Sequence, residues 1–211
     1  MQYVIGHTYF RDLKISVGPQ VLIPRPETEM LVDLALKELK ADKPKVLDLC
    51  CGSGCIACAV ANEVMDAKVV AVDVSNLALN YAYKNCEELS LTDRVMIINA
   101  DIKKELPIAN DFDLIISNPP YVPNDVYENM PKEVVNFEPS LALRAGDSGL
   151  DFLPDIIRVS KTHLKKGGVL ALELFEDSIQ EAAKTLKKEG LENIKTFCDL
   201  ANKDRYILAT I

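Results

Sequence analysis

Short apolar runs alternate with amphipathic segments along most of this chain. Uninterrupted apolar runs are typical of strands that a parallel sheet buries on both faces. They predict strands at residues 45–49, 68–73, 94–99, 112–117, 168–174, 193–198 and 205–211. Apolar residues at helical spacing predict helices near 30–39, 55–65, 76–89, 150–165 and 176–188. Alternating strands and helices indicate an α/β fold with a doubly wound sheet.

The segment before this alternation has a different pattern. Residues 3–17 alternate in polarity, which predicts a β-hairpin with a turn near Gly6 and strands at 3–5, 8–10 and 13–17. Pro24 and Pro26 then hold Arg25 in an extended arm, and Pro26 suits the first turn of the following helix. A lone arginine in such an arm is usually a solvated charge.

Residues 122–149 interrupt the alternation of strands and helices. The stretch contains three prolines, and three glutamates make it acidic. A loop of this length inside a compact domain is usually a binding element or a lid. We therefore expect residues 122–149 to form a lid over a substrate.

Length and charge narrow the class of protein. The 211 residues suffice for one domain over 1–211, in which 1–24 form the hairpin and arm. The net charge of -8 makes nucleic acid an improbable ligand, because duplexes are held through their phosphates. No apolar run reaches the roughly 18 residues of a membrane helix, and residues 1–6 lack the pattern of a signal peptide. We expect a cytoplasmic protein without membrane contact.

Six cysteines raise the question of a metal site. They stand at positions 50, 51, 55, 58, 86 and 198. The first four have suggestive spacing, but no second C-x₂-C pair completes a tetrahedral site. We expect reduced thiols packed beside a strand and a helix, and no metal.

The stretch from Asn118 to Tyr121 follows the predicted strand at 112–117 and suits a particular chemistry. A planar –NH₂ group, as in a carboxamide or an aminopurine, is a poor nucleophile because its lone pair is delocalised. A site that accepts hydrogen bonds from both N–H groups orients this lone pair toward an electrophile. The Asn118 side-chain oxygen offers one acceptor and the Pro119 carbonyl a second. Pro119 and Pro120 fix the backbone, and Tyr121 offers a flat face to the planar group or to a cationic methyl donor. A simple turn after a strand is the alternative.

A nucleotide-like ligand fits the strand ends nearby. In open α/β sheets, ligands bind at the carboxyl ends of strands, beside the first strand–helix turn. Asp73 is placed to accept hydrogen bonds from a ribose diol, and Asp101 and Ile102 to meet an amino group and an adenine face. Asp48 is placed to meet an ammonium group through the turn or a water. Each carboxylate taken singly also fits a helix cap. The turn itself comprises Cys50, Cys51, Gly52, Ser53 and Gly54.

The choice of cofactor depends on the glycines of this turn. NAD(H) is the usual ligand of a strand, Gly-rich loop and helix followed by an aspartate, but the full G-x-G-x-x-G fingerprint is absent. S-adenosylmethionine has no pyrophosphate and does not require the three glycines of that fingerprint. It also supplies the electrophile that the segment 118–121 needs.

With these motifs in place, the sequence resembles the HemK/PrmC family of protein-(glutamine N5) methyltransferases. The likeness covers nearly the whole chain. It is carried by VLIPRPETE (21–29), LDLCCGSGCIA (47–57), Asp73, SNPPYV (117–122), FEPSLAL (137–143), GDSGLD (146–151) and DRYIL (204–208).

The resemblance implies a fold, an activity and a partner. The fold would be a class I methyltransferase, Rossmann-like, with a seven-stranded mostly parallel sheet and an antiparallel last strand. The loop 50–54, Asp73 and Ile102 would contact S-adenosylmethionine. Segment 118–121 would hold a glutamine side chain from the Gly-Gly-Gln loop of a class 1 peptide chain release factor, and Arg25 would help bind this substrate.

Three departures from the family pattern keep other hypotheses open. Family members usually begin with a helical substrate-recruiting domain, whereas Met1 here stands almost at the hairpin. Cys50 replaces the first glycine of the loop and requires a φ outside the glycine-only region. Phe175 replaces the glycine of Leu-Glu-Ile-Gly. The alternatives are an amino-methyltransferase acting on adenine in DNA or RNA, and a decayed cofactor-binding module.

Overall fold

The computed structural model describes residues 1–108 and 111–211. Its core is a seven-stranded sheet in the order β5-β4-β3-β6-β7-β9-β8. β9 runs antiparallel to both neighbours, whereas the pairs from β5 to β7 are parallel. The predicted mostly parallel sheet with an antiparallel last strand is therefore confirmed. The strands are β3 (Lys45–Leu49), β4 (Lys68–Asp73), β5 (Val95–Asn99), β6 (Phe112–Ser117), β7 (Leu164–Glu173), β8 (Glu192–Cys198) and β9 (Asp204–Thr210).

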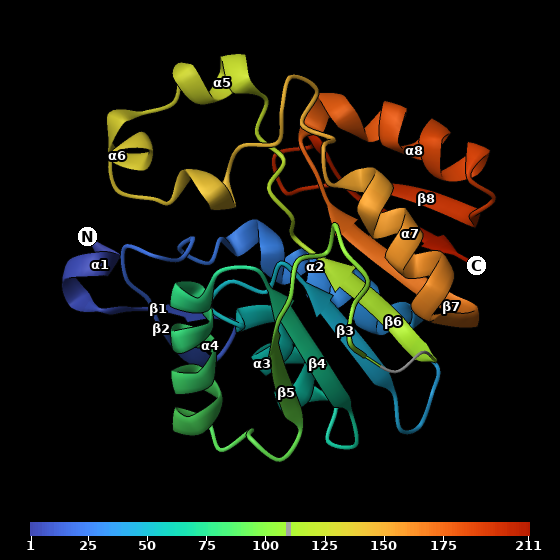
Figure 1. Cartoon of the computed structure of the whole chain (residues 1–211), viewed down its shortest axis with the longest axis horizontal. Helices are drawn as coiled ribbons and strands as arrows, with labels where there is room; N and C mark the ends of the chain where they lie inside the picture. Colours follow the sequence, from blue (N-terminus) through green and yellow to red (C-terminus); the bar gives the residue numbers. More distant parts are fainter. Residues whose placement is uncertain (109–110) are drawn as a thin grey trace.

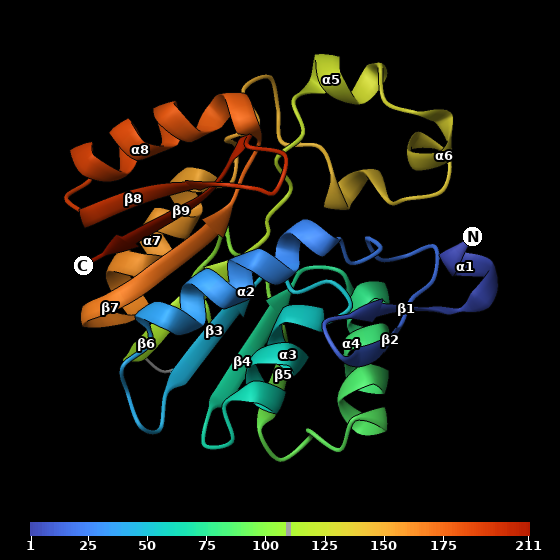
Figure 2. The same ribbon diagram turned by 180° about the vertical axis from the view of Figure 1, so that it is seen from behind.

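Helices cover both faces of the sheet (Figures 1 and 2). Alternate strand residues point to opposite sides, so Leu114 and Ile116 join one core cluster while Ile115 joins the other. One face carries α2 (Pro26–Glu38), α3 (Cys55–Glu63) and α4 (Asn76–Glu88). The other carries α7 (Leu153–His163) and α8 (Ile179–Lys188), and the 3₁₀ turn η2 (Glu176–Ser178) precedes α8.

The N-terminal prediction needs correction. A hairpin forms, but it pairs β1 (His7–Phe10) with β2 (Leu13–Ser16). The expected strand at 3–5 is instead the single helical turn α1 (Gln2–Ile5), which Gly6 ends at φ 81°. Val4 is 88% exposed, so no sheet face holds this segment extended.

The segment 122–149 contains more regular structure than its breakers suggested. It forms α5 (Asn124–Glu128), α6 (Lys132–Val135) and the 3₁₀ turn η1 (Ser140–Ala142). A bridge between Val122 and Arg144 closes its base. The segment lies beyond the carboxyl ends of the strands, outside both helix layers (Figure 1).

Candidate functional site

Two cavities meet at Asn118, which follows β6 at the carboxyl edge of the sheet. The first spans about 780 Å³ and the second about 690 Å³, part of it open to solvent, and Asn118 belongs to the wall of both. The first cavity brings together the predicted residues Cys50, Gly52, Asp73, Asp101, Ile102, Asn118 and Pro120. The second brings together Arg25, Asn118, Pro119 and Tyr121. Pro120, which was predicted to bind substrate, faces the first cavity.

The turn after β3 has a backbone shape suited to close contact with a ligand. Cys50 adopts φ 59°, in the left-handed region that side chains enter at a cost of about 1 kcal/mol. The expectation that Cys50 has a φ outside the region that favours glycine is therefore wrong. Gly54 has φ 74°, and a Cβ there would stand 3.1 Å from Cβ of Ala82. Positions 50 and 54 thus both adopt a backbone conformation that favours glycine, and position 54 also leaves little room for a side chain.

Asp73 links this turn to the end of β4. Its Oδ2 accepts a hydrogen bond from the Gly52 N–H at 2.8 Å, and its Oδ1 accepts one from the Ser75 N–H at 2.8 Å. Burial raises the pKa of Asp73, although these backbone N–H groups oppose the shift. Each carboxylate oxygen keeps a second lone pair for a ligand hydroxyl.

Four residues of the predicted cofactor set lie outside the cavity wall: Asp48, Cys51, Ser53 and Gly54. Asp48 is completely buried beneath the turn, where its Oδ2 accepts the Ala57 N–H at 3.1 Å. Its Oδ1 is buried without a hydrogen-bond partner among the described residues. Because Asp48 is completely buried and lies outside the cavity wall, a link from this oxygen to a ligand through the turn or a water stays a prediction.

The cysteines are free thiols. Four belong to the buried core, and the sulfurs of Cys58 and Cys86 lie 3.7 Å apart between α3 and α4. Burial raises the pKa of Cys55 to about 12, so this thiol stays neutral at physiological pH. Cys51, Cys55, Cys58 and Cys86 therefore pack as small apolar groups.

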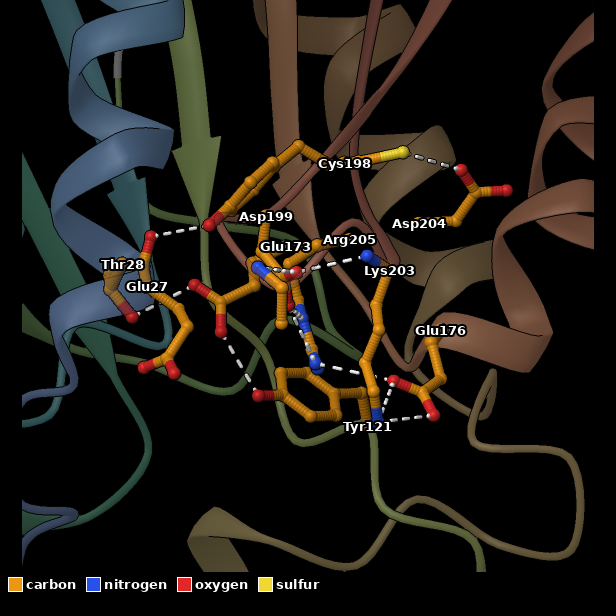
Figure 3. A network of polar contacts seen from close by, with 12 residues as sticks. Glu27, Thr28, Tyr121, Glu173, Glu176, Cys198, Asp199, Lys203, Asp204 and Arg205 are labelled. Atoms are coloured by element: carbon orange, nitrogen blue, oxygen red, sulfur yellow. Dashed lines mark hydrogen bonds and ion pairs between the residues drawn. The ribbon is translucent and has the colours of Figure 1, made fainter.

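Asn118 is held by a chain of buried polar groups, of which Figure 3 shows Thr28, Glu173 and Tyr121. Its Nδ2 donates to Oγ1 of Thr28 at 2.9 Å, and the Thr28 hydroxyl donates to Oε2 of Glu173 at 2.8 Å. The Tyr121 hydroxyl donates to Oε1 of Glu173 at 3.0 Å. Oδ1 of Asn118 accepts no hydrogen bond within the described part of the chain, so it is available to a ligand.

The second cavity contains two arginines. Arg25 forms an ion pair with Glu138 of the segment 122–149, so it is not the solvated charge that its arm suggested. Arg205 forms ion pairs with Asp199 and Glu176 (Figure 3). Phe175, the residue in place of the family's glycine, also belongs to this wall.

Several site residues were missed by the sequence analysis. Thr28 and Glu173 hold Asn118, Phe152 lines the first cavity and Arg205 lines the second. Thr28 and Glu173 stand within motifs, and Glu173 ends a parallel strand, where ligands usually bind. Arg205 stands within the motif DRYIL (204–208), but the motif alone assigns it no role, and Phe152 directly follows the motif at 146–151.

Comparisons with known proteins identify relatives of this chain. Residues 27–136 match the family model of the methyltransferase small domain. A release factor glutamine methyltransferase of Clostridium acetobutylicum is 37% identical over 211 residues, which cover 99% of this chain and 74% of the relative. One from Rhodopirellula baltica is 38% identical, over 97% of this chain and 71% of the relative.

Solved structures agree on the fold. The hMettl16 catalytic domain, in complex with a 3′UTR hairpin, gives a TM-score of 0.75 at 19% identity, over 94% of this chain and 75% of that one. A methyltransferase from Pyrococcus furiosus gives 0.69 at 19% identity, over 95% and 90%. Fold and site thus define a class I methyltransferase, an enzyme that uses S-adenosylmethionine. Within this class, the chain belongs to the HemK/PrmC family of release factor glutamine methyltransferases.

Proposed function

We propose that this enzyme methylates the side-chain amide nitrogen of a glutamine, in the Gly-Gly-Gln loop of a class 1 peptide chain release factor. The single observation that supports this best is Asn118, whose NH₂ is held from behind while its oxygen is left for a ligand. A primary amide needs such acceptors to direct its nitrogen lone pair. The relatives are named release factor glutamine methyltransferases, and these names support a release factor as the substrate. We place the reaction in the cytoplasm, with its protein substrate.

The first cavity is the proposed cofactor site. When bound, S-adenosylmethionine supplies an electrophilic methyl group on a sulfonium. Asp73 accepts hydrogen bonds from the ribose hydroxyls, Asp101 meets the adenine amino group and Ile102 packs on the adenine ring. Cys50 and Gly52 bring the backbone of the turn against the nucleoside.

The second cavity is the proposed amide site. Oδ1 of Asn118 and the carbonyl of Pro119 accept hydrogen bonds from the two N–H groups of the glutamine side chain. The Tyr121 ring packs on the planar carboxamide. Asn118 and Pro119 would thus hold the amide nitrogen with its lone pair toward the methyl group that bound S-adenosylmethionine would supply, with S-adenosylhomocysteine as the leaving group. The methylated nitrogen would lose a proton to water. Catalysis here rests on positioning rather than on a strong base.

Residues 122–149 are the proposed lid. Pro139, Leu141 and Ala142 of this segment contribute to the first cavity, and Val126 and Met130 to the second. The lid therefore contacts both sites at once. Its ion pair with Arg25 ties it to the arm before α2.

A transfer assay tests the function. The enzyme is incubated with methyl-labelled S-adenosylmethionine and a release factor, the same factor with its Gly-Gly-Gln glutamine changed to alanine, or DNA. We expect label on the first substrate alone. Asn118→Ala removes one of the two acceptors and should lower kcat by about 100-fold, without a matching loss of S-adenosylhomocysteine binding. Label on DNA alone would refute the proposal, and cofactor binding without transfer to any substrate would favour a decayed module.

A further inference from the structure

The direction of the hydrogen bonds behind Asn118 is set by a carboxyl group. Glu173 is 1% exposed at the end of β7, and Thr28 is 2% exposed on α2. A carboxylate accepts hydrogen bonds and donates none, so the single Thr28 proton is committed to Glu173. The Thr28 oxygen is left with lone pairs only. It pairs with the NH₂ end of the Asn118 amide and not with the oxygen end.

We propose that Glu173 and Thr28 are positioning residues for methyl transfer: together they fix the Asn118 amide so that its oxygen faces the methyl acceptor. This inference rests on the proposed function, because only a methyl acceptor that carries N–H groups needs the Asn118 oxygen turned toward it. With the amide reversed, Asn118 would aim N–H donors at the N–H groups of the substrate. An asparagine amide is nearly symmetric in shape, so packing alone does not select between the two orientations.

The surroundings of Glu173 bear on its charge. Burial raises its pKa above the usual 4.5, and the hydrogen bonds from Thr28 and Tyr121 and the nearby charge of Arg205 oppose that shift. Glu27 on α2 raises the pKa further. The hydroxyl of Tyr206 and the thiol of Cys55 also lie within electrostatic range. When pH falls through this raised pKa, the carboxyl gains a proton of its own and no longer fixes the direction of the chain.

Isosteric variants test the proposal. Glu173→Gln keeps the shape of the side chain but adds an NH₂ donor, which releases the Thr28 proton. Thr28→Val keeps the shape of Thr28 and removes the hydroxyl. Both should lower kcat by about 100-fold with the Kd for S-adenosylhomocysteine unchanged. Thr28→Ser restores the hydroxyl and should restore kcat. In the wild type, kcat should fall as the solution is acidified, with the midpoint of the fall at a pH above 4.5. The residual kcat of Glu173→Gln should not show this fall.

A matched control comes from the same packing. Tyr206 stands opposite Glu173 in the β7–β9 register, and its hydroxyl donates to the Glu27 carbonyl of α2 at 2.7 Å. Tyr206→Phe removes a buried hydrogen bond between a neighbouring strand and the same helix, without touching Asn118. Its kcat should match that of the wild type.

The outcomes separate the two proposals. Wild-type kcat in Glu173→Gln or Thr28→Val, no recovery in Thr28→Ser, or an equal loss in Tyr206→Phe would each overturn the positioning role. If the wild type binds S-adenosylhomocysteine but labels no glutamine, the proposed function fails instead. Neutron structures of the wild type and Glu173→Gln then decide the positioning role alone. A reversed Asn118 amide in the variant supports it, and an unchanged amide overturns it.

Discussion

Asp48 is an unusual residue because its carboxyl group is completely buried with one oxygen unpartnered in the described structure. Burial raises its pKa well above 3.8, and the hydrogen bond from the Ala57 N–H offsets only part of that shift. A carboxyl whose pKa is raised by folding binds its proton more tightly in the native state than in the unfolded chain. Its contribution to stability is therefore most favourable in acid and declines as pH rises from 3.8 toward the native pKa.

Asp48→Asn should remove this pH dependence. The amide keeps an acceptor for the Ala57 N–H but does not ionise. The free energy of unfolding of the variant, relative to the wild type, should rise by up to about 1.4 kcal/mol per pH unit above the ordinary carboxyl pKa. Urea titrations at several pH values from 4 upward measure it. A difference that stays constant with pH would contradict the prediction.

At the residue scale, sequence reasoning is most direct where a side chain follows a strand end. Asp73, Asp101 and Ile102 all line the first cavity, because parallel strands bring their carboxyl ends to one edge, and their contacts with a cofactor stay a prediction. Thr28 and Glu173 were missed because their contact joins residues 145 positions apart. Asp48, beneath the turn, shows that a strand residue just before its end points into the core.

The proposed lid, residues 122–149, has a close backbone approach at its base. Gly149 adopts φ 73°, and a Cβ there would stand 2.4 Å from the Tyr121 carbonyl oxygen. Backbone fills that space, so a side chain would displace Tyr121 or open the bridge at Val122. Gly167 has nearly the same φ, 78°, but has open space around it.

These two glycines make a matched pair of variants. Gly167→Ala should cost about 1 kcal/mol of stability from the backbone conformation alone. Gly149→Ala carries the same cost and a clash, so it should cost about 3 kcal/mol and also lower kcat. Thermal unfolding and the transfer assay measure both effects. Equal losses at the two positions would show that the contact with Tyr121 does not matter.

At the element scale, the buried strands were the easiest to predict. β4 and β6 have the predicted bounds, because uninterrupted apolar residues leave one way to bury both faces. Residues 3–5 were predicted as a strand from a short alternating pattern, but they belong to α1, which contains no fully buried residue. In the segment 122–149, prolines suggested an irregular loop, yet two of them stand immediately before α5 and α6.

The whole molecule carries a net charge of -8, although its sheet resembles that of a domain solved with a 3′UTR hairpin. Nucleic-acid affinity that relies on phosphate contacts grows as salt is removed. We expect no binding of a labelled RNA hairpin or DNA duplex in fluorescence anisotropy, even at low salt. A basic DNA-binding protein measured in the same buffer provides the control. An anisotropy rise that weakens with added salt would reveal a basic groove that the total charge conceals.

The sheet topology was predictable from the sequence only with the help of the family resemblance. The alternation of strands and helices gave the α/β class, but the local sequence holds no signal that places β9 between β7 and β8.

No helix in the described residues is long and apolar enough to cross a membrane. Relative placement of the lid, the arm and the two cavities required the tertiary structure.

The position of Asn118 in the wall of both cavities has a stereochemical consequence. If nucleoside and amide arrive from separate chambers, the nitrogen approaches the methyl carbon from the face remote from sulfur. Configuration at that carbon then inverts. A methyl group made chiral with three hydrogen isotopes would emerge on the glutamine with the opposite handedness.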